Sequence, residues 1–373
     1  MDYNATSPVR PRALEALERV TRDCYGNASS AHQLGRTARR YLDDARESIA
    51  KCVGVEPREV VFTSGGTESD NLAIKGVVAQ FTRGHIVTST VEHPAVLETC
   101  RFFDEHGFDV TYLDVDEMGR VNPDEAAAAV RDDTLVMSVM WVNNETGVIQ
   151  PIEELAAIAH ARGVLLHTDA VQAFGRVPVD LSIAPVSLLS ISGHKFGGPN
   201  GVGALIVRRG VELMASTHGG GQEWNTRSGT HNVSGVVAMA EAALEATQEM
   251  EKEQERLEFL RNRLEKGLLD RISDTHVNGA DADRVANTSN IRLDGADGEA
   301  VLIALDEQGI CASSASACAA AHTEPSHVLT AMGMSRRQAE DSMRFSLGAD
   351  STEDDVDKLV EVTPEIVERI RGL

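Results

Sequence analysis

The segment from residue 188 to 199 constrains the fold more than any other stretch of the chain. Its sequence reads Leu188-Leu189-Ser190-Ile191-Ser192-Gly193-His194-Lys195-Phe196-Gly197-Gly198-Pro199. An apolar strand therefore ends in Ser-Gly-His and delivers a lysine into a loop rich in glycine and proline. The chain has only six lysines, and the other five lie in polar, helix-like surroundings. Because desolvation at the end of a buried strand disfavours the charged amine, Lys195 is predicted to be a nucleophile that links covalently to a carbonyl group.

A second apolar strand, Val164–Asp169, ends in a carboxylate. A lysine that carries a carbonyl cofactor and an aspartate that pairs with a pyridine nitrogen are the two groups that pyridoxal 5′-phosphate (PLP) requires. Gln172 follows Asp169 by about one turn and would reach the ring hydroxyl of the cofactor. The alternative role for Asp169 is to cap a helix that follows it.

Short apolar runs alternate with helix-like segments between about residues 60 and 210. The predicted strands are Val60–Thr63, His85–Ser89, Asp109–Val115, Leu135–Val142, Val164–Asp169, Ser187–Ser192 and Gly203–Val207. This alternation predicts an α/β fold with a mostly parallel seven-stranded sheet flanked by helices. Ligands of such sheets bind beyond the carboxyl ends of the strands, where Thr63, Asp169 and Lys195 fall.

The second part of the chain is predicted to form a smaller α+β domain. Its expected elements are a long amphipathic helix Val236–Leu269, a strand Thr288–Leu293, a helix Gly298–Gln308, a loop from Ile310 to Thr323, and a terminal helix with a capping box at Ser351–Asp354. We predict a large α/β domain of residues 13–250. Residues 1–12 and 251–373 would form the smaller domain, which carries the mobile cysteine loop from Ile310 to Thr323.

Charge and composition narrow the class of protein and its partners. The formal net charge of −23 is spread along all 373 residues, which argues against nucleic acid or an anionic membrane as a direct partner. Such a surface is typical of a halophilic source, where salt screens self-repulsion.

No apolar run reaches the roughly 18 residues that a membrane helix needs, and the start lacks the pattern of a signal peptide, so a cytoplasmic location is predicted. The five cysteines show neither a disulfide framework nor zinc-ligand spacing, so no metal site is predicted.

A candidate phosphate-binding loop follows the first predicted strand. In Ser64-Gly65-Gly66-Thr67-Glu68-Ser69 the glycines let the backbone approach an anion, and the helix that starts there offers unpaired N–H donors. Gly66 and Thr67 are therefore candidate cofactor ligands. The alternative is an ordinary Gly-Gly turn before a capping threonine.

Two further residues have candidate roles in the chemistry. His93, in Val91-Glu92-His93-Pro94-Ala95, would stack on the cofactor ring and relay protons; otherwise it caps a loop. Arg344 lies in an apolar run, Met343-Arg344-Phe345-Ser346-Leu347-Gly348, and a buried arginine needs an anionic partner. That partner is either the carboxylate of an amino-acid substrate, gripped by two parallel hydrogen bonds, or an internal salt bridge.

The loop from Cys311 to His322 consists mostly of small residues and contains Cys318. A cysteine on such a loop is accessible and mobile, as a nucleophile that must travel requires. The alternative is a small-residue turn in which Cys318 has no chemical role.

Taken together, these motifs resemble the cysteine desulfurase family, the NifS/IscS-like branch of the PLP-dependent class V aminotransferases. The resemblance runs nearly from end to end and includes Asp2-Tyr3-Asn4-Ala5-Thr6-Ser7-Pro8, Phe62-Thr63-Ser64-Gly65-Gly66-Thr67-Glu68-Ser69, Glu92-His93-Pro94-Ala95-Val96, Asn143-Asn144-Glu145-Thr146-Gly147, His167-Thr168-Asp169-Ala170-Val171-Gln172, Ser192-Gly193-His194-Lys195, Arg227-Ser228-Gly229-Thr230, Ser316-Ala317-Cys318 and Arg344-Phe345-Ser346-Leu347-Gly348. It implies the fold of PLP-dependent transferases of fold type I.

The resemblance also implies a role for each candidate residue. Lys195 would carry PLP and act as a base, Asp169 and Gln172 would hold the pyridine ring, and His93 would stack on it. The phosphate would be bound by Thr67, Ser192 and His194, and by Thr230 of the second subunit of a homodimer. Asn144 and Arg344 would bind the substrate carboxylate. Cys318 would take the sulfur of L-cysteine as a persulfide and release L-alanine.

The implied partner is a sulfur-acceptor protein, such as a scaffold for iron–sulfur clusters, and the implied process is iron–sulfur cluster assembly or tRNA thiolation. Cys318 is also a candidate cluster ligand. Two alternatives remain open: a selenocysteine lyase or aminotransferase of the same fold, for which Cys318 is dispensable, and a non-catalytic sulfur-relay or scaffold protein.

Overall fold

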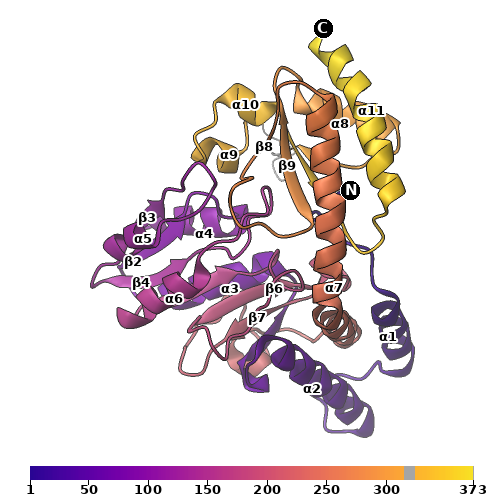
Figure 1. Ribbon diagram of the computed structural model, residues 1–373. Helices are drawn as coiled ribbons and strands as arrows, with labels where there is room; N and C mark the ends of the chain where they lie inside the picture. Colours follow the sequence, from indigo (N-terminus) through magenta and orange to yellow (C-terminus); the bar gives the residue numbers. More distant parts are fainter. Residues whose placement is uncertain (315–323, 373) are drawn as a thin grey trace.

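The computed structural model describes residues 1–314 and 324–372 (Figure 1). Its larger sheet has seven strands: β1 (Val60–Thr63), β2 (His85–Ser89), β3 (Asp109–Leu113), β4 (Thr134–Ser138), β5 (Leu165–Asp169), β6 (Leu188–Ser192) and β7 (Gly203–Val207). The strand order is β1-β7-β6-β5-β4-β2-β3, and only β7 runs antiparallel to its neighbours. The predicted mostly parallel seven-stranded sheet is confirmed.

Helices cover both faces of this sheet because its strands are apolar on both sides. Neighbouring residues point to opposite faces: Phe62 belongs to the hydrophobic cluster under one face and Val61 to the cluster under the other. The first face packs against α1 (Pro11–Asp23), α2 (Gln33–Val53), α6 (Ile152–Ala161) and the start of α7 (Val233–Arg271). The second face packs against α3 (Gly66–Val78) and α4 (Pro94–Asp104). A short helix, α5 (Pro123–Ala129), lies beside α6.

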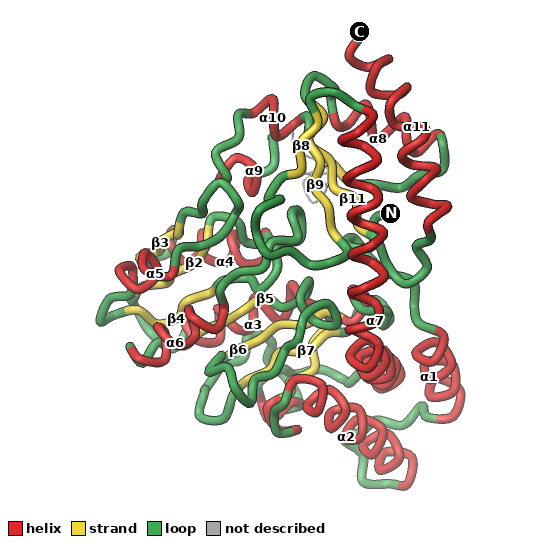
Figure 2. Tube along the Cα trace, in the orientation of Figure 1, coloured by secondary structure: helices red, strands yellow, loops and turns green. Residues whose placement is uncertain are grey.

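A smaller antiparallel sheet stands apart from the first, and the long helix α7 runs past both (Figures 1 and 2). Its strands, in the order β10-β11-β9-β8, are β10 (Ser313–Ser314), β11 (Ser342–Ser346), β9 (Thr288–Leu293) and β8 (Thr275–Val277). Helices α8 (Gly298–Glu307) and α11 (Glu353–Arg371) pack on it around their own hydrophobic cluster. Two short helices, α9 (His327–Ala331) and α10 (Arg336–Glu340), complete this part. The smaller α+β unit is confirmed, whereas the domain boundaries stay a prediction.

Helix α7 contributes to two hydrophobic clusters with different parts of its length. Its residues from Val233 to Ala246 pack against the large sheet, and those from Leu257 to Leu268 pack against the small one. The helix therefore fixes the two sheets relative to each other.

Two expectations from the sequence differ in detail from the structure. The segment from Ile310 was expected to be a loop, but Ser313 and Ser314 pair with β11, whose residue Arg344 lies opposite Ser313. The terminal helix begins one residue later than the Ser351–Asp354 pattern, because the box is formed by Thr352 and Asp355. Among the described residues, no helix is both long and apolar enough to span a bilayer.

Candidate active site

A cavity of about 410 Å³ lies beyond the carboxyl ends of β5 and β6. Ten of the twelve predicted site residues line it: Gly66, Thr67, His93, Asn144, Asp169, Gln172, Ser192, His194, Lys195 and Arg344. Of the remaining two, Thr230 is exposed and is not part of the lining. Cys318 lies outside the residues that the structure describes. The fold thus brings together side chains from six segments of the chain.

Lys195 ends the single turn Gly193–Lys195 that follows β6. The apolar strand before it had predicted a fully buried lysine, but Lys195 is half-buried. The amine donates to the backbone carbonyl of Asn4 at 2.5 Å and to that of Ala5 at 3.0 Å. Carbonyl oxygens only accept hydrogen bonds, so the amine is the donor in both contacts.

Asp169 is the last residue of β5 and is only 5% exposed. Its carboxylate accepts a hydrogen bond from the backbone N–H of Val171 at 2.8 Å. Burial raises the pKa of Asp169, while His93, the Val171 N–H and Lys195 act in the opposite direction. Asp169 therefore caps a local turn and at the same time presents a carboxyl group to the cavity.

His93 also has both of the roles considered for it. It caps α4, where its Nδ1 accepts from the backbone N–H of Ala95 at 3.1 Å. Burial lowers the pKa of His93; Asp169 opposes this and Lys195 adds to it. Since Nδ1 is an acceptor, the neutral ring carries its proton on Nε2, and the residue lines the cavity.

The start of α3 forms one end of the cavity. Gly65 precedes the helix with φ of 152°, a backbone conformation that a side chain would strain. A Cβ on Gly66 would lie 2.7 Å from Cγ2 of Val171, so glycine lets the helix start approach the segment after β5. Gly66 and Thr67 at this helix start line the same cavity as Ser192 and His194, an arrangement that suits a phosphate. Burial, with Lys195 nearby, lowers the pKa of His194 to about 4.

The opposite end of the cavity is built around Arg344. Its Nη1 donates to the backbone carbonyl of Asn144 at 3.0 Å, and its Nη2 pairs with the Asp2 carboxylate at 2.8 Å. Its Nε is buried without a hydrogen-bond partner. Arg344 therefore forms the internal salt bridge that was one of its two predicted roles. Its Nε is a further donor, which an anionic ligand could use.

Gln172 has a defined amide orientation. Its Oε1 accepts from the guanidinium of Arg176, and its Nε2 donates to the Asn4 carbonyl at 3.1 Å. Because an arginine can only donate, the oxygen must face Arg176 and the NH₂ group must face Asn4 and the cavity.

These residues fit PLP. The cavity combines an anion-binding helix start, a buried carboxyl group, a lysine amine and an amide NH₂. The cofactor's phosphate, pyridine nitrogen, aldehyde and ring hydroxyl would meet these groups in that order. The buried Nε of Arg344 remains for a second anion.

The sequence-based assignment missed several residues of the lining, chiefly Asp2, Asn4, Asp70, Met140 and Ser313. Asp2 and Asn4 belong to the motif Asp2–Pro8, so the resemblance contained a signal for them. Asp70 is buried in α3, with one carboxyl oxygen unpartnered and its pKa raised well above the usual range by burial and by Asp169. Nothing in its local sequence distinguishes it from a surface aspartate.

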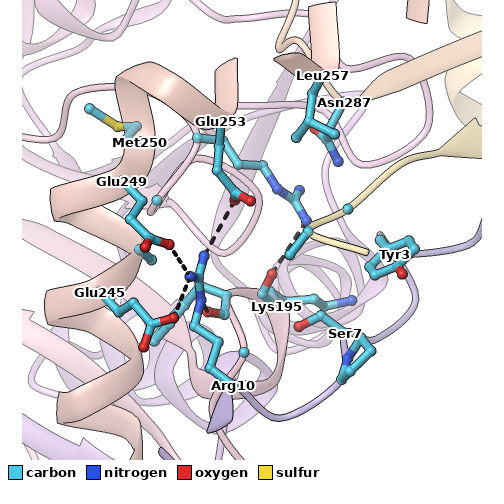
Figure 3. Close-up of a pocket in the computed structure, with 18 of the residues that line it drawn as sticks. Tyr3, Ser7, Arg10, Lys195, Glu245, Glu249, Met250, Glu253, Leu257 and Asn287 are labelled. Atoms are coloured by element: carbon cyan, nitrogen blue, oxygen red, sulfur yellow. Dashed lines mark hydrogen bonds and ion pairs between the residues drawn. The ribbon is translucent and has the colours of Figure 1, made fainter. Parts of the chain in front are cut away.

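A second cavity, of about 320 Å³, lies on another side of Lys195 (Figure 3). Three glutamates of α7 reach Arg10 across it: Glu245 at 3.0 Å, Glu249 at 2.9 Å and Glu253 at 3.4 Å. This cavity has neither the helix start nor the buried Asp169, so it lacks the groups that PLP needs. No cluster of three histidine, cysteine or acidic side chains suited to a metal ion is found in residues 1–314 and 324–372.

Comparisons with known proteins give a consistent picture. Residues 1–359 match the family described as aminotransferase class-V. The chain is 47% identical over 375 residues to a cysteine desulfurase IscS of Methanosarcina thermophila, with 100% of this chain and 93% of that protein covered. It is also 47% identical over 380 residues to an IscS-like cysteine desulfurase of Mycobacterium tuberculosis, covering 100% and 96% of the two chains.

Solved structures agree with this. A NifS-like protein superposes with a TM-score of 0.92 at 38% identity, over 99% of this chain and 98% of that one. A structure described as SspA in complex with cysteine superposes with a TM-score of 0.83 at 36% identity, over 93% and 97% of the two chains.

Proposed function

The chain belongs to the class-V aminotransferase family, and we propose that within this family it acts as a PLP-dependent cysteine desulfurase. The observation that carries this proposal is the single cavity that collects Lys195, Asp169 and Arg344 in a chain whose full-length relatives are cysteine desulfurases. Its substrate would be L-cysteine, and its products L-alanine and a protein-bound sulfur atom.

The cofactor end of the cavity would hold PLP. When bound, PLP supplies an electron sink that lets bonds at Cα and Cβ of an amino acid break. Lys195 would carry the cofactor, and Asp169 would keep the pyridine nitrogen protonated. Gln172 would donate to the ring hydroxyl, while Gly66, Thr67, Ser192 and His194 would surround the phosphate.

Two residues would move protons at this end. Lys195 would take the proton from Cα of the substrate, because its amine is held beside Asp169 and His93 at the cavity wall. His93 carries a proton on Nε2 when neutral and so would donate it to an acceptor in the cavity.

The other end would select an amino acid. Arg344 would bind the substrate carboxylate through its guanidinium, and the Asn144 carbonyl would keep that guanidinium in place. The Asn144 side chain, which lines the cavity, would supply a further contact.

Cys318 would receive the sulfur atom as a persulfide and pass it by thiol exchange to an acceptor protein, such as an iron–sulfur scaffold. The process served would be iron–sulfur cluster assembly or tRNA thiolation. The exposure of Thr230 supports the proposal that it completes the phosphate site of a second copy in a homodimer. The net charge of −23 supports a salt-rich cytoplasm as the working environment.

The test is the stoichiometry of products from L-cysteine. The PLP-loaded protein in high salt with a thiol reductant is expected to form alanine and sulfide in equal amounts. Lys195→Ala should abolish both and remove the cofactor's visible absorbance. Cys318→Ala should abolish sulfide release, whereas Cys311→Ala, at an exposed cysteine nearby, should not. Full activity of Cys318→Ala would favour an aminotransferase or selenocysteine lyase instead.

A further inference from the structure

Asn4 is an asparagine with an unusually complete set of hydrogen bonds at the wall of the cavity. It is 2% exposed and belongs to the extended N-terminal segment rather than to a helix or strand. A buried asparagine is costly unless its polar atoms are paired, and here the described contacts pair every one of them.

The backbone carbonyl of Asn4 connects two residues of the cofactor end. It accepts from the Lys195 amine at 2.5 Å and from Nε2 of Gln172 at 3.1 Å. The position of this one oxygen therefore influences both the amine that would carry PLP and the amide that would meet the ring hydroxyl. The second N–H of Gln172 is left to face the cavity, since Arg176 holds the other end of the amide.

The side chain of Asn4 fixes this carbonyl from the opposite direction. Its Nδ2 donates to the Thr288 hydroxyl at 2.9 Å and to the Asn144 carbonyl at 3.1 Å. Its Oδ1 accepts from Nδ2 of Asn287 at 3.0 Å, and its backbone N–H donates to the Ser346 hydroxyl at 2.9 Å. Three of these partners belong to β9, to the residue before it, or to β11.

We propose that Asn4 is a positioning residue that sets the place of the Lys195 amine by anchoring its own carbonyl to the small sheet. The inference rests on the proposed role of Lys195. The Asn4 and Ala5 carbonyls hold the amine whenever it is not linked to the cofactor. Because both oxygens accept from the amine, they keep it at the wall of the cavity that Asp169 also lines.

The anchoring also links the two parts of the molecule. The small sheet, which carries Arg344, and the lysine of the large domain share Asn4 as a common neighbour. A displacement of β9 or β11 would therefore move the resting place of the lysine amine as well as the carboxylate-binding guanidinium.

Asn4→Ala tests this directly. The variant should still fold, because Asn287 retains the Leu347 carbonyl and Thr288 retains Asn287 as partners. Thr288→Val is a milder variant, which removes only one anchor. Asn278→Ala is the matched control: Asn278 is also buried, and it bonds Asn290 and Ser342 within the small sheet, away from Lys195.

The first readout is the rate at which the full-length protein, stripped of cofactor, captures added PLP. Borohydride reduction and peptide mass then locate the label. Asn4→Ala is expected to capture PLP roughly tenfold more slowly at neutral pH, because the carbonyl that positions the amine is no longer anchored through Thr288, Asn144 and Asn287. Thr288→Val should slow capture by less, and Asn278→Ala should leave the rate unchanged.

The second readout compares the change in kcat with the change in KM for the PLP-loaded enzyme. Asn4→Ala should lower kcat and leave KM for L-cysteine within about twofold. A wild-type rate of capture and a wild-type kcat for Asn4→Ala would overturn the inference while leaving the proposed function intact. An equal loss in Asn278→Ala would overturn it too, by showing a general effect of buried amides. A wild-type label on a residue other than Lys195 would instead overturn the proposed function.

Discussion

The two ends of the cavity are built in different ways. The cofactor end comes from strand ends and a helix start at one sheet: Asp169 ends an apolar strand, and Gly66 and Lys195 each follow one within a few residues. The substrate end is assembled from segments far apart in the chain: Arg344 and Asp2, its ion-pair partner, are 342 positions apart. The cofactor end thus depends on the sheet itself, whereas the substrate end depends on individual hydrogen bonds between the two parts of the molecule.

The largest effect is expected at the cofactor end. Asp169→Asn should lower kcat/KM on the order of 10³-fold, because a neutral amide no longer keeps the pyridine nitrogen protonated. Steady-state kinetics and the visible spectrum of the bound cofactor measure this. Asp70→Asn is the matched control, since burial raises the pKa of Asp70 and favours its neutral form. A loss in Asp70→Asn as large as that in Asp169→Asn would show that the charge has been assigned to the wrong carboxyl group.

At the substrate end, Arg344→Lys should raise KM for L-cysteine roughly tenfold to a hundredfold, because lysine cannot make two parallel hydrogen bonds to a carboxylate. The spectrum of the bound cofactor should not change, which separates the two ends. Arg292→Lys, on the neighbouring strand β9 and ion-paired with Asp294, should leave KM unchanged. A changed cofactor spectrum in Arg344→Lys would mean that the two ends are not independent.

The buried carboxyl of Glu92 gives the cofactor end a pH-dependent stability. Burial raises its folded-state pKa from 4.5 to about 8, although the Ser89 hydroxyl and the Met140 N–H donate to it. The folded protein therefore retains a proton that the unfolded chain loses, so this residue lowers the free energy of unfolding as pH rises from 4.5 to about 8.

In Glu92→Gln, the free energy of unfolding should fall less steeply as pH rises. Denaturant unfolding across the same pH range measures this. The slope that remains has a contribution from Glu145, whose pKa burial raises to about 7. An unchanged slope in Glu92→Gln would show that Glu92 is not the titrating group.

The smallest effect is expected from Asp2→Asn. The Asp2 side chain is 24% exposed and competes with the substrate carboxylate for Arg344. Because partly exposed ion pairs contribute about 1 kcal/mol or less, KM for L-cysteine should fall no more than about fivefold. Added salt should reduce the difference between variant and wild type. A higher KM would indicate that Asp2 orients the guanidinium rather than competing for it.

Much of the cofactor end could be predicted from the sequence because its signals are local. Apolar runs of four to eight residues located all seven strands of the large sheet, with boundary differences of a few residues. Lys195 and Asp169 then followed from their places at strand ends. The helices α1 and α2 were not identified, since they lie before the region in which strands and helices alternate.

The sequence by itself determined the fold class, the family and most of the residues around the cavity, because periodicity and motifs are properties of neighbouring residues. Only the tertiary structure decided that Asp2 pairs with Arg344, that Lys195 is half-buried, and that Asn4 joins the small sheet to the lysine. These contacts join residues between 191 and 342 positions apart. Hydrogen bonds at such separations are set by how two packed sheets meet across α7, and no local pattern in the chain encodes that geometry.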